Sequence, residues 1–262
     1  MKGAAMELLE RMKAGISRNI SRMAGEGAEY SDARFFADDR SENLVLYDGN
    51  LEANDTTFQT GTGVRVLWGG AWGFSASSDP DKLDACFDQA LANARTASRL
   101  VSVPLRMGRA APIHGSYSSP VVTDPFSVPL EEKLEFLMGI DKALKEDWIA
   151  RRAIAAGFMR RTVLFMNSDG SEIVKNTTNV FADMIIMALD VDGMMQRRSM
   201  TLFTTGKGTR GWEMLCVPEL FCGHADRIKH PEKARASSKA VRRAKTRAAT
   251  TMTAMKTERV VG

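Results

Sequence analysis

Apolar residues recur at helical spacing in three segments of the chain. In residues 6–23 they stand every three or four positions, with Lys and Arg on the other faces, which predicts an amphipathic helix. Residues 83–97 repeat the pattern with mostly small side chains, so this second helix can lie close on a sheet. A third stripe over residues 130–148 predicts a third helix. Asp141 interrupts that stripe, and we interpret it as a charge at the edge of the stripe that reaches solvent.

Alternation of apolar and polar positions fills much of the remaining chain and predicts β-strands. A meander of about five short strands is expected between the first two helices, and longer strands joined by short turns follow the third helix. The first group comprises residues 30–36, 43–47, 51–59, 64–68 and 71–76. The second group comprises residues 153–166, 172–178, 180–191 and 194–204.

Glycines mark the sharpest turns between these strands. Asp48-Gly49 is a strong hairpin signal, and Gly69-Gly70 supplies the positive backbone angles that a two-residue hairpin turn requires. At such positions the backbone geometry dictates the residue type. They therefore identify a fold better than they identify a reaction.

The order of these elements predicts an α+β fold. We expect an antiparallel, mostly meandering sheet with about three helices packed on one face. Residues 102–129, between the second and third helices, form a linker with five prolines that is long for a structureless loop. We expect this linker to cross the surface in extended form.

The turn and strand segments resemble one family. Tyr30-Ser-Asp-Ala-Arg34, Gly61-x-Gly-Val-Arg-Val-Leu67 and Gly70-Ala-Trp-Gly-Phe74 are similar to the N-terminal domain of TldD/PmbA proteins, also known as modulators of DNA gyrase. Three later segments resemble the second half of the same domain: Asn167-Ser-Asp-Gly-Ser-Glu172, Gly193-x-x-Gln196 and Gly211-Trp-Glu213. The resemblance covers roughly residues 5–228 and rests on the whole pattern, since no single motif is diagnostic.

The resemblance implies a proteolytic assembly. The family is known for a zinc-dependent metallopeptidase that acts on flexible peptides, in which a catalytic TldD subunit pairs with a related subunit lacking the metal site. For this chain it implies a homo- or hetero-dimer with a TldD/PmbA-type subunit, whose hollow interior encloses the peptide-cleaving site. Strand edges that pair with the backbone of an extended peptide suit a peptidase of broad specificity.

The zinc motif of the catalytic members is missing from the sequence. Those members carry a His-Glu-x-x-x-His helix and a further Cys in a second, mainly β, domain, whereas none of His114, His224 and His230 is followed by Glu. A helical zinc site needs two imidazoles about one turn apart and a carboxylate that polarises the water. We therefore assign no catalytic, cofactor-binding or metal residue, and we expect neither zinc nor the zinc-binding C-terminal domain in this chain.

Other candidate sites have better structural explanations. Gly61-x-Gly63 precedes a strand, whereas a dinucleotide-binding loop must follow one. Cys216, Cys222 and His224 are three candidate metal ligands, but thiols that are simply buried or exposed are more common. The Met-rich later strands fit core filling better than a peptide groove. His114 stands in the linker and is taken as a surface residue.

Charge divides the chain near residue 228. Residues 227–262 carry 11 Lys and Arg against 2 Glu, which gives +9, whereas residues 1–226 carry 25 basic against 30 acidic residues, which gives −5. The basic segment has few branched aliphatic residues to anchor it to a core. We expect an N-terminal α+β domain over residues 1–228 and a weakly structured basic tail over residues 229–262. The tail is either disordered or the remnant of a frame-shifted or truncated gene.

The basic tail also supports an alternative function, a non-enzymatic binding or adaptor protein that uses the tail on nucleic acid. Lys and Arg bind phosphates without reading sequence, through counterion release. The tail has no aromatic residue to stack on bases, so we keep the TldD/PmbA-type interpretation first. No apolar run is long enough to span a membrane, and the three cysteines have no short paired spacing. We therefore expect a cytoplasmic protein without a membrane partner.

Overall fold

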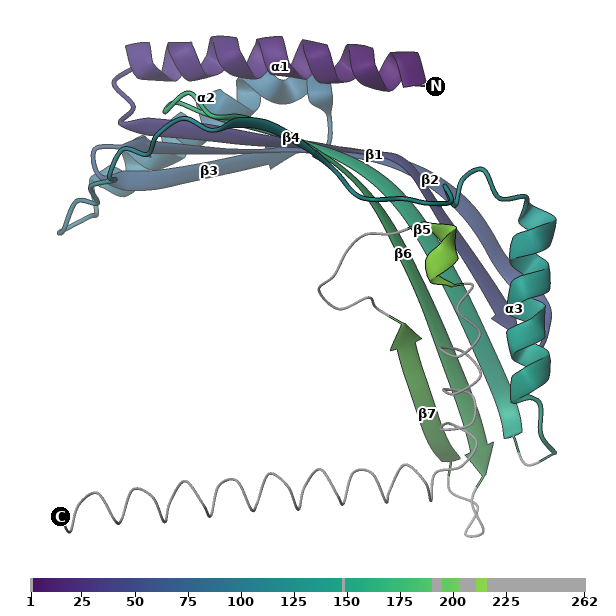
Figure 1. Ribbon diagram of the computed structural model, residues 1–262. Helices are drawn as coiled ribbons and strands as arrows, with labels where there is room; N and C mark the ends of the chain where they lie inside the picture. Colours follow the sequence, from purple (N-terminus) through teal and green to yellow (C-terminus); the bar gives the residue numbers. More distant parts are fainter. Residues whose placement is uncertain (1, 148, 190–194, 203–210, 216–262) are drawn as a thin grey trace, which may run out of the picture.

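The computed structural model describes residues 2–147, 149–189, 195–202 and 211–215 (Figure 1). Its helices are α1 (Lys2–Gly25), α2 (Leu83–Ser98) and α3 (Leu130–Leu144). Its strands are β1 (Tyr30–Tyr47), β2 (Asn50–Trp68), β3 (Ala71–Ser77), β4 (His114–Ser118), β5 (Ile149–Asn167), β6 (Glu172–Leu189) and β7 (Met195–Leu202). Short 3-10 turns span Pro80–Lys82 and Trp212–Met214.

One sheet contains all the described strands. Its order is β3-β2-β1-β5-β6-β4, and β7 pairs with β6 as well. The pairs are antiparallel except for β4, which runs parallel to β6. Neighbours in the chain are mostly neighbours in the sheet, so the expected α+β fold with a meandering sheet and three helices is confirmed.

The structure has fewer and longer strands than the alternation predicts. Some strands bend and continue at a position where the sequence pattern predicts that one strand ends and another begins. β1 joins the predicted strands 30–36 and 43–47 into one strand of 18 residues. One additional residue between Asp38 and Ser41 shifts its register against β2, and the same residue shifts it against β5. Such a bulge bends a strand and increases its twist without ending it. β2 and β6 likewise each join two predicted strands.

The bulge also keeps one face of β1 apolar along its whole length. Ala33 and Phe35 are buried before the bulge, and Leu44 and Leu46 are buried after it. The buried residues thus have odd numbers before the bulge and even numbers after it. Side chains alternate between the two faces of a strand, so one additional residue is needed to return the apolar set to the same face.

All three helices pack on that apolar face, on the convex side of the curved sheet (Figure 1). α1 and α2 cover one half of the sheet and α3 covers the other. The first core cluster comprises Met12, Ile16, Met23, Ala33, Phe35, Val64, Val66, Leu83, Cys86, Phe87, Ala90, Leu91, Leu164 and Met166. The second includes Leu44, Leu46, Leu137, Ile140, Leu144, Ile154, Phe158, Met184, Ile186 and Trp212. The expectation of helices on one face is confirmed.

The small side chains of α2 allow a close approach to β3, as their pattern predicts. Ala90 and Ala94 are fully buried. A Cβ atom on Gly73 of β3 would lie 1.9 Å from the carbonyl oxygen of Ala90 and 2.4 Å from the backbone nitrogen of Ala94. Only glycine leaves room for the helix backbone here.

The turn between β2 and β3 has the predicted geometry. Gly69 has a φ of 56° and Gly70 a φ of 72°, so both central residues are in the left-handed region. This is the combination that a two-residue turn needs to match the right-handed twist of its strands. The glycine pair is therefore correctly placed by the sequence pattern.

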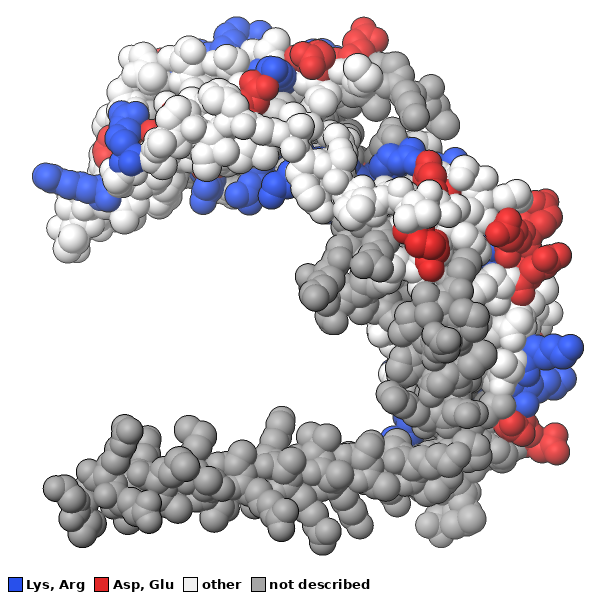
Figure 2. All heavy atoms as spheres, in the orientation of Figure 1, with Lys and Arg blue, Asp and Glu red and all other residues white. Residues whose placement is uncertain are grey.

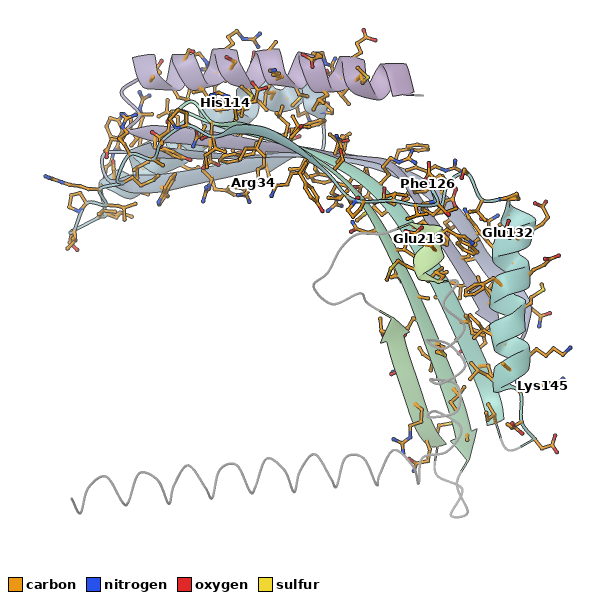
Figure 3. All side chains as sticks on the ribbon, viewed as in Figure 1. Arg34, His114, Phe126, Glu132, Lys145 and Glu213 are labelled. Atoms are coloured by element: carbon orange, nitrogen blue, oxygen red, sulfur yellow. The ribbon has the colours of Figure 1, made fainter. Side chains whose placement is uncertain are left out.

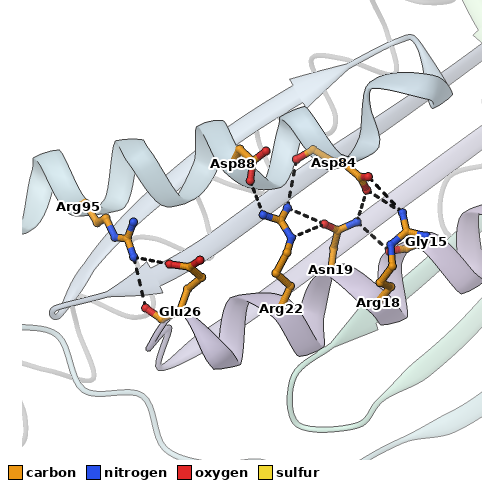
Figure 4. Close-up of polar contacts among 8 residues, drawn as sticks. All are labelled: Gly15, Arg18, Asn19, Arg22, Glu26, Asp84, Asp88 and Arg95. Carbon is orange, nitrogen blue, oxygen red and sulfur yellow. Dashed lines mark hydrogen bonds and ion pairs between the residues drawn. The ribbon is translucent and has the colours of Figure 1, made fainter.

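Polar side chains join α1 to α2 above the sheet (Figure 4). The amide nitrogen of buried Asn19 donates to the Gly15 carbonyl oxygen at 2.9 Å and to the Asp84 carboxylate at 2.6 Å. Arg22 donates to the amide oxygen of Asn19 at 2.7 Å. The hydrogen bond from Asn19, together with the one from Arg18, lowers the pKa of Asp84. Asn19 thus has its donors and its acceptor satisfied, as a buried amide requires.

Buried ion pairs hold α3 against the sheet, and they correct the interpretation of Asp141. This residue does not reach solvent, because its carboxylate accepts hydrogen bonds of 2.9 and 3.3 Å from the guanidinium of Arg152 on β5. Both side chains are about 10% exposed. Lys133 and Glu42 form a second buried pair at 2.5 Å between α3 and β1. A charge in an apolar stripe is buried here because the sheet supplies its counter-ion.

The linker between α2 and α3 contains a strand that the pattern does not indicate. β4 pairs in parallel with the start of β6, from His114 opposite Glu172 to Ser118 opposite Asn176. All five of its residues are exposed, so it shows no alternation of apolar and polar positions. Backbone pairing alone places this segment on the sheet.

Candidate functional site

The concave face of the sheet is free of helices in the described part of the chain (Figure 3). Side chains there alternate with the core residues of the same strands, so Arg34 and Phe36 of β1 point away from the face that buries Ala33 and Phe35. Figure 3 shows Arg34 directed to the concave side, away from α1. The curvature of the sheet gathers these side chains into one surface.

Three adjacent strands line a hollow of about 560 Å³ on this face. Ligand sites in proteins generally fall within several hundred cubic ångströms, so the hollow is large enough for a few side chains of a bound molecule. We call it the concave hollow. Its lining residues are Arg34 and Phe36 of β1, Arg161, Val163 and Phe165 of β5, and Ile173 and Lys175 of β6.

The register of the strands arranges this lining as a grid. One row runs across the sheet from Arg34 through Phe165 to Ile173, and the next runs from Phe36 through Val163 to Lys175. Rows on one face are separated by about 6.7 Å along the strands, and neighbouring strands by about 4.8 Å. The hollow therefore presents positive and apolar side chains at regular intervals.

Two arginines lie over aromatic rings in the concave hollow. The guanidinium carbon of Arg34 is 5.3 Å from the centroid of Phe165, and that of Arg161 is 4.8 Å from the centroid of Phe36. Arg161 also donates hydrogen bonds of 2.5 and 2.9 Å to buried Asp38, which raise the pKa of its guanidinium. Cation–π contacts of this kind hold the side chains in position.

The concave hollow has an excess of positive charge. Asp38 balances Arg161, but among the described residues neither Arg34 nor Lys175 has an acidic side chain within ion-pair distance. Both of these cations are exposed. Figure 2 shows Lys and Arg side chains along the inner edge of the upper part of the sheet. The surface therefore suits an anionic group.

The sequence pattern does not single out these residues. Arg34 belongs to the segment of residues 30–34 that resembles the family. A charged residue that alternates with buried ones, however, indicates only the solvent-exposed face of a strand. Lys175 and Phe165 lie on other strands, and only the pairing of β1 with β5 and of β5 with β6 brings the three together. The alternation of Arg and Phe on one face of β1 is the one local signal.

The residues discounted on sequence grounds stay outside the concave hollow. His114 is exposed on β4, as expected for a surface residue. Gly61 serves packing, because a Cβ atom there would lie 2.3 Å from the ring of Phe36. Cys216, Cys222 and His224 lie outside the described residues, as do His230 and the tail over residues 229–262.

The described ranges do not fit a zinc site. In them, no group of three or more His, Cys, Asp and Glu side chains is arranged to hold a metal ion. Buried Cys86 is a free thiol whose pKa is raised by its burial, which disfavours the thiolate that binds metals. We therefore assign no step to a metal in this part of the chain. Nor does any helix in the described part combine the length and apolar character needed to cross a membrane.

The Gly211-Trp-Glu213 segment is tied to the linker before α3, and its Trp212 packs in the core cluster with Phe158. The Glu213 carboxylate accepts hydrogen bonds from the backbone N–H of Thr123 at 2.8 Å, Gly211 at 3.0 Å and Val122 at 3.2 Å. Burial by itself raises the pKa of Glu213, but these donors outweigh it, so the pKa lies below the ordinary glutamate value. Glu213 thereby fixes the chain before α3 to the segment of residues 211–215.

Replacing Glu213 by Gln should destabilise the protein by about 1 kcal/mol near neutral pH, because a neutral amide oxygen accepts these bonds more weakly. The pKa of the folded state is lowered, so the stabilisation is complete above the ordinary glutamate value and is lost as the pH falls through the lowered pKa. Urea unfolding of both proteins at several pH values measures this. A difference that persists undiminished in strong acid would show that the charge is not the cause.

Two segments of the chain match models of known protein families. Residues 35–94 match the family described as PmbA/TldA metallopeptidase domain 1, and residues 123–248 match the PmbA/TldA metallopeptidase central domain. This chain belongs to the TldD/PmbA family. The second match runs past residue 228, so the resemblance extends further along the sequence than expected.

Individual relatives agree with this assignment. The chain is 26% identical over 187 residues to a protein named metalloprotease from Methanothermobacter thermautotrophicus. The match covers 71% of this chain and 39% of that protein, so the chain spans well under half of the relative's length.

Solved structures of the family share the fold. A Thermotoga maritima protein, named for a suggested role as modulator of a DNA gyrase, matches with a TM-score of 0.56 and 15% identity, covering 83% of this chain and 47% of that one. A Bacteroides thetaiotaomicron protein of similar name matches with a TM-score of 0.55 and 13% identity, covering 72% and 44%. At such identities the likeness concerns the fold.

Proposed function

We propose that this chain is the peptide-holding, non-metal part of a TldD/PmbA-type metallopeptidase assembly. The observation that carries the proposal is the concave face, on which the described residues place no helix (Figure 3), with its hollow of about 560 Å³, in a chain whose two matched segments are metallopeptidase domains. The three described helices lie on the outer side of the curved sheet (Figure 1), which leaves its inner side for a second molecule.

The sheet also offers backbone groups for binding. β3 pairs only with residues 62–68 of β2, so no described strand pairs with the outer edge of β2 between residues 50 and 59. Leu51 and Phe58 on this segment are 43% and 59% exposed. An extended peptide can add to such an edge through main-chain hydrogen bonds, with neighbouring side chains providing preference.

In this proposal the chemistry of cleavage belongs to another subunit or domain. The chain holds a flexible peptide in extended form, as part of a homo- or hetero-dimer with a TldD/PmbA-type subunit, and that subunit supplies zinc. The cytoplasmic location, the domain boundary after residue 228 and the origin of the tail in a shifted frame stay predictions.

The purified chain should bind an unstructured peptide without cleaving it. Fluorescence anisotropy of a labelled flexible peptide measures binding, mass spectrometry of the same sample measures cleavage, and elemental analysis measures zinc. A disulfide-cyclised peptide of the same composition is the control, and it should bind at least about tenfold more weakly because it cannot extend. Stoichiometric zinc with peptide cleavage by the chain alone would overturn the assignment of a non-metal role.

The charge of +9 in residues 227–262 favours one alternative, an adaptor that binds nucleic acid non-specifically. Affinity for random-sequence DNA should then fall steeply with salt and vanish when residues 229–262 are deleted. Peptide binding that survives this deletion favours the peptidase-type function, since the concave hollow lies entirely outside the tail.

A further inference from the structure

We infer that the concave hollow selects acidic segments of an extended peptide, with Arg34 and Lys175 as the carboxylate-binding residues. This inference rests on the proposed peptide-holding function and adds a substrate class to it. Neither family membership nor the likeness in fold specifies such a preference.

The first reason is the uncompensated charge. Arg34 and Lys175 lie at the two sides of the hollow, on β1 and β6, and both are exposed without an acidic partner among the described residues. Arg161 of β5 stands one row further along the sheet than Lys175 and is already paired with Asp38. Two carboxylates that enter the hollow therefore each meet one unpaired cation, and no existing ion pair is displaced.

The second reason is the fixed position of Arg34. Its guanidinium lies over the ring of Phe165, which is half-buried and stands directly opposite Arg34 on β5. Less rotamer freedom is lost on binding when a side chain is already restrained. The guanidinium also keeps its donor edge available, because a cation–π contact occupies its face.

The hollow suits a peptide better than a nucleic acid. Arg161 covers one face of the Phe36 ring, and Arg34 covers one face of the Phe165 ring. These two covered faces cannot stack on a base. Single-stranded nucleic acid depends on such stacking as well as on charge. Apolar Val163 and Ile173 between the cations fit aliphatic side chains.

The occupant is also a molecule other than this chain. The basic tail over residues 229–262 carries 10 Lys and Arg against 2 Glu, a charge of +8, and is repelled by a positive hollow. A second copy of the chain docked here through its own hollow would place two positively charged surfaces against each other. Charge complementarity therefore points to an acidic segment of another protein.

The spacing of the two cations sets a pattern for that segment. Arg34 and Lys175 are two strands apart across the sheet and one row apart along it. This places their Cα atoms about 12 Å apart, from about 9.6 Å across and about 6.7 Å along. Acidic residues four positions apart in an extended peptide are separated by about 13 Å. We expect such a pair to bind best.

Binding of labelled flexible peptides to the full chain tests this inference. One peptide carries two Glu residues four positions apart in a Gly/Ser/Ala/Val background, a second carries Gln at both positions, and a third carries the two Glu residues adjacent to each other. The acidic peptide with the wide spacing should bind about tenfold more tightly than the Gln peptide, since two charge-assisted hydrogen bonds are replaced by neutral ones. The adjacent-Glu peptide should fall between them.

Variants of the two cations connect this preference to the concave hollow. Arg34→Gln combined with Lys175→Gln should reduce the affinity for the widely spaced acidic peptide about tenfold and leave that for the Gln peptide unchanged. Arg34→Lys, which keeps the charge, should retain most of the binding. Lys145→Gln is the matched control, because Lys145 is exposed at the end of α3, on the convex side (Figure 3).

The outcomes separate this inference from the function on which it rests. If acidic and Gln peptides bind equally well, the acidic preference is wrong and the peptide-holding function stands. If no peptide binds to a chain with unchanged circular dichroism, both are wrong. An equal loss of affinity in Lys145→Gln would contradict a specific site. Competition by oligo-dT at equal concentration, dependent on Arg34, would overturn the assignment to peptides.

Discussion

Replacing Gly73 by alanine is expected to destabilise the protein by about 3 kcal/mol, through overpacking between β3 and α2. The new Cβ atom would stand 1.9 Å from the Ala90 carbonyl oxygen and 2.4 Å from the Ala94 nitrogen. These are backbone atoms of a helix, so they cannot move aside as a flexible side chain can. Urea unfolding followed by circular dichroism measures the loss.

Gly139→Ala is the matched control for this prediction. Gly139 lies in the exposed part of α3, and a Cβ atom there meets nothing within 4 Å. The substitution should stabilise the protein by about 0.5 to 1 kcal/mol, because alanine favours a helix interior more than glycine does. Equal effects of the two substitutions would show that α2 does not lie as close to β3 as the packing of Ala90 and Ala94 indicates.

Asp141→Ala should destabilise the protein by about 3 kcal/mol or more, because it leaves the buried guanidinium of Arg152 without its hydrogen-bonded counter-ion and with only the Asp48 carboxylate, 4.0 Å away. Both side chains are about 10% exposed in the folded protein. The combined variant Asp141→Leu and Arg152→Met should recover most of this loss, since an apolar pair needs no counter-ion. Urea unfolding of the three proteins at neutral pH gives the comparison.

An exposed ion pair provides the control for Asp141. Arg11 and Asp81 are 3.1 Å apart, with side chains 58% and 76% exposed. Arg11→Ala should change the stability by less than about 0.5 kcal/mol, because solvent screens such a pair. If Asp141→Ala were equally mild, water would have to reach Arg152, and the account of α3 docking through buried charges would be wrong.

The placement of the helices connects these structural predictions to function. The close packing at Gly73 and the buried pair at Asp141 keep α2 and α3 on the convex face. The bulge at residues 38–41 keeps the apolar side chains of β1 on that face across the bend. The concave face is consequently left with charged and aromatic side chains that the core does not need.

Local signals were sufficient for several elements. The periodicity of residues 6–23, 83–97 and 130–148 indicates the three helices, because an amphipathic stripe is a property of neighbouring residues. Gly69-Gly70 indicates its turn, since few other residues adopt a positive φ at low cost. The α+β class follows from the order of these elements.

Other features depend on partners that are distant in the sequence. The bulge that merges two predicted strands is visible only in the register of β1 against β2 and β5. Strand β4 has no pattern of its own and is positioned by β6. Asp141 resembles a surface charge until Arg152 is brought to it across the α3–sheet interface.

The sequence by itself therefore determined the helices, the hairpin turn, the fold class and the resemblance to the TldD/PmbA family. It did so because periodicity, turn chemistry and family segments are written in residues close together along the chain. The tertiary structure alone decided which side of the sheet stays open and which residues meet there. Arg34, Phe165 and Lys175 come from three strands, and only strand pairing and the bend of the sheet make them one surface.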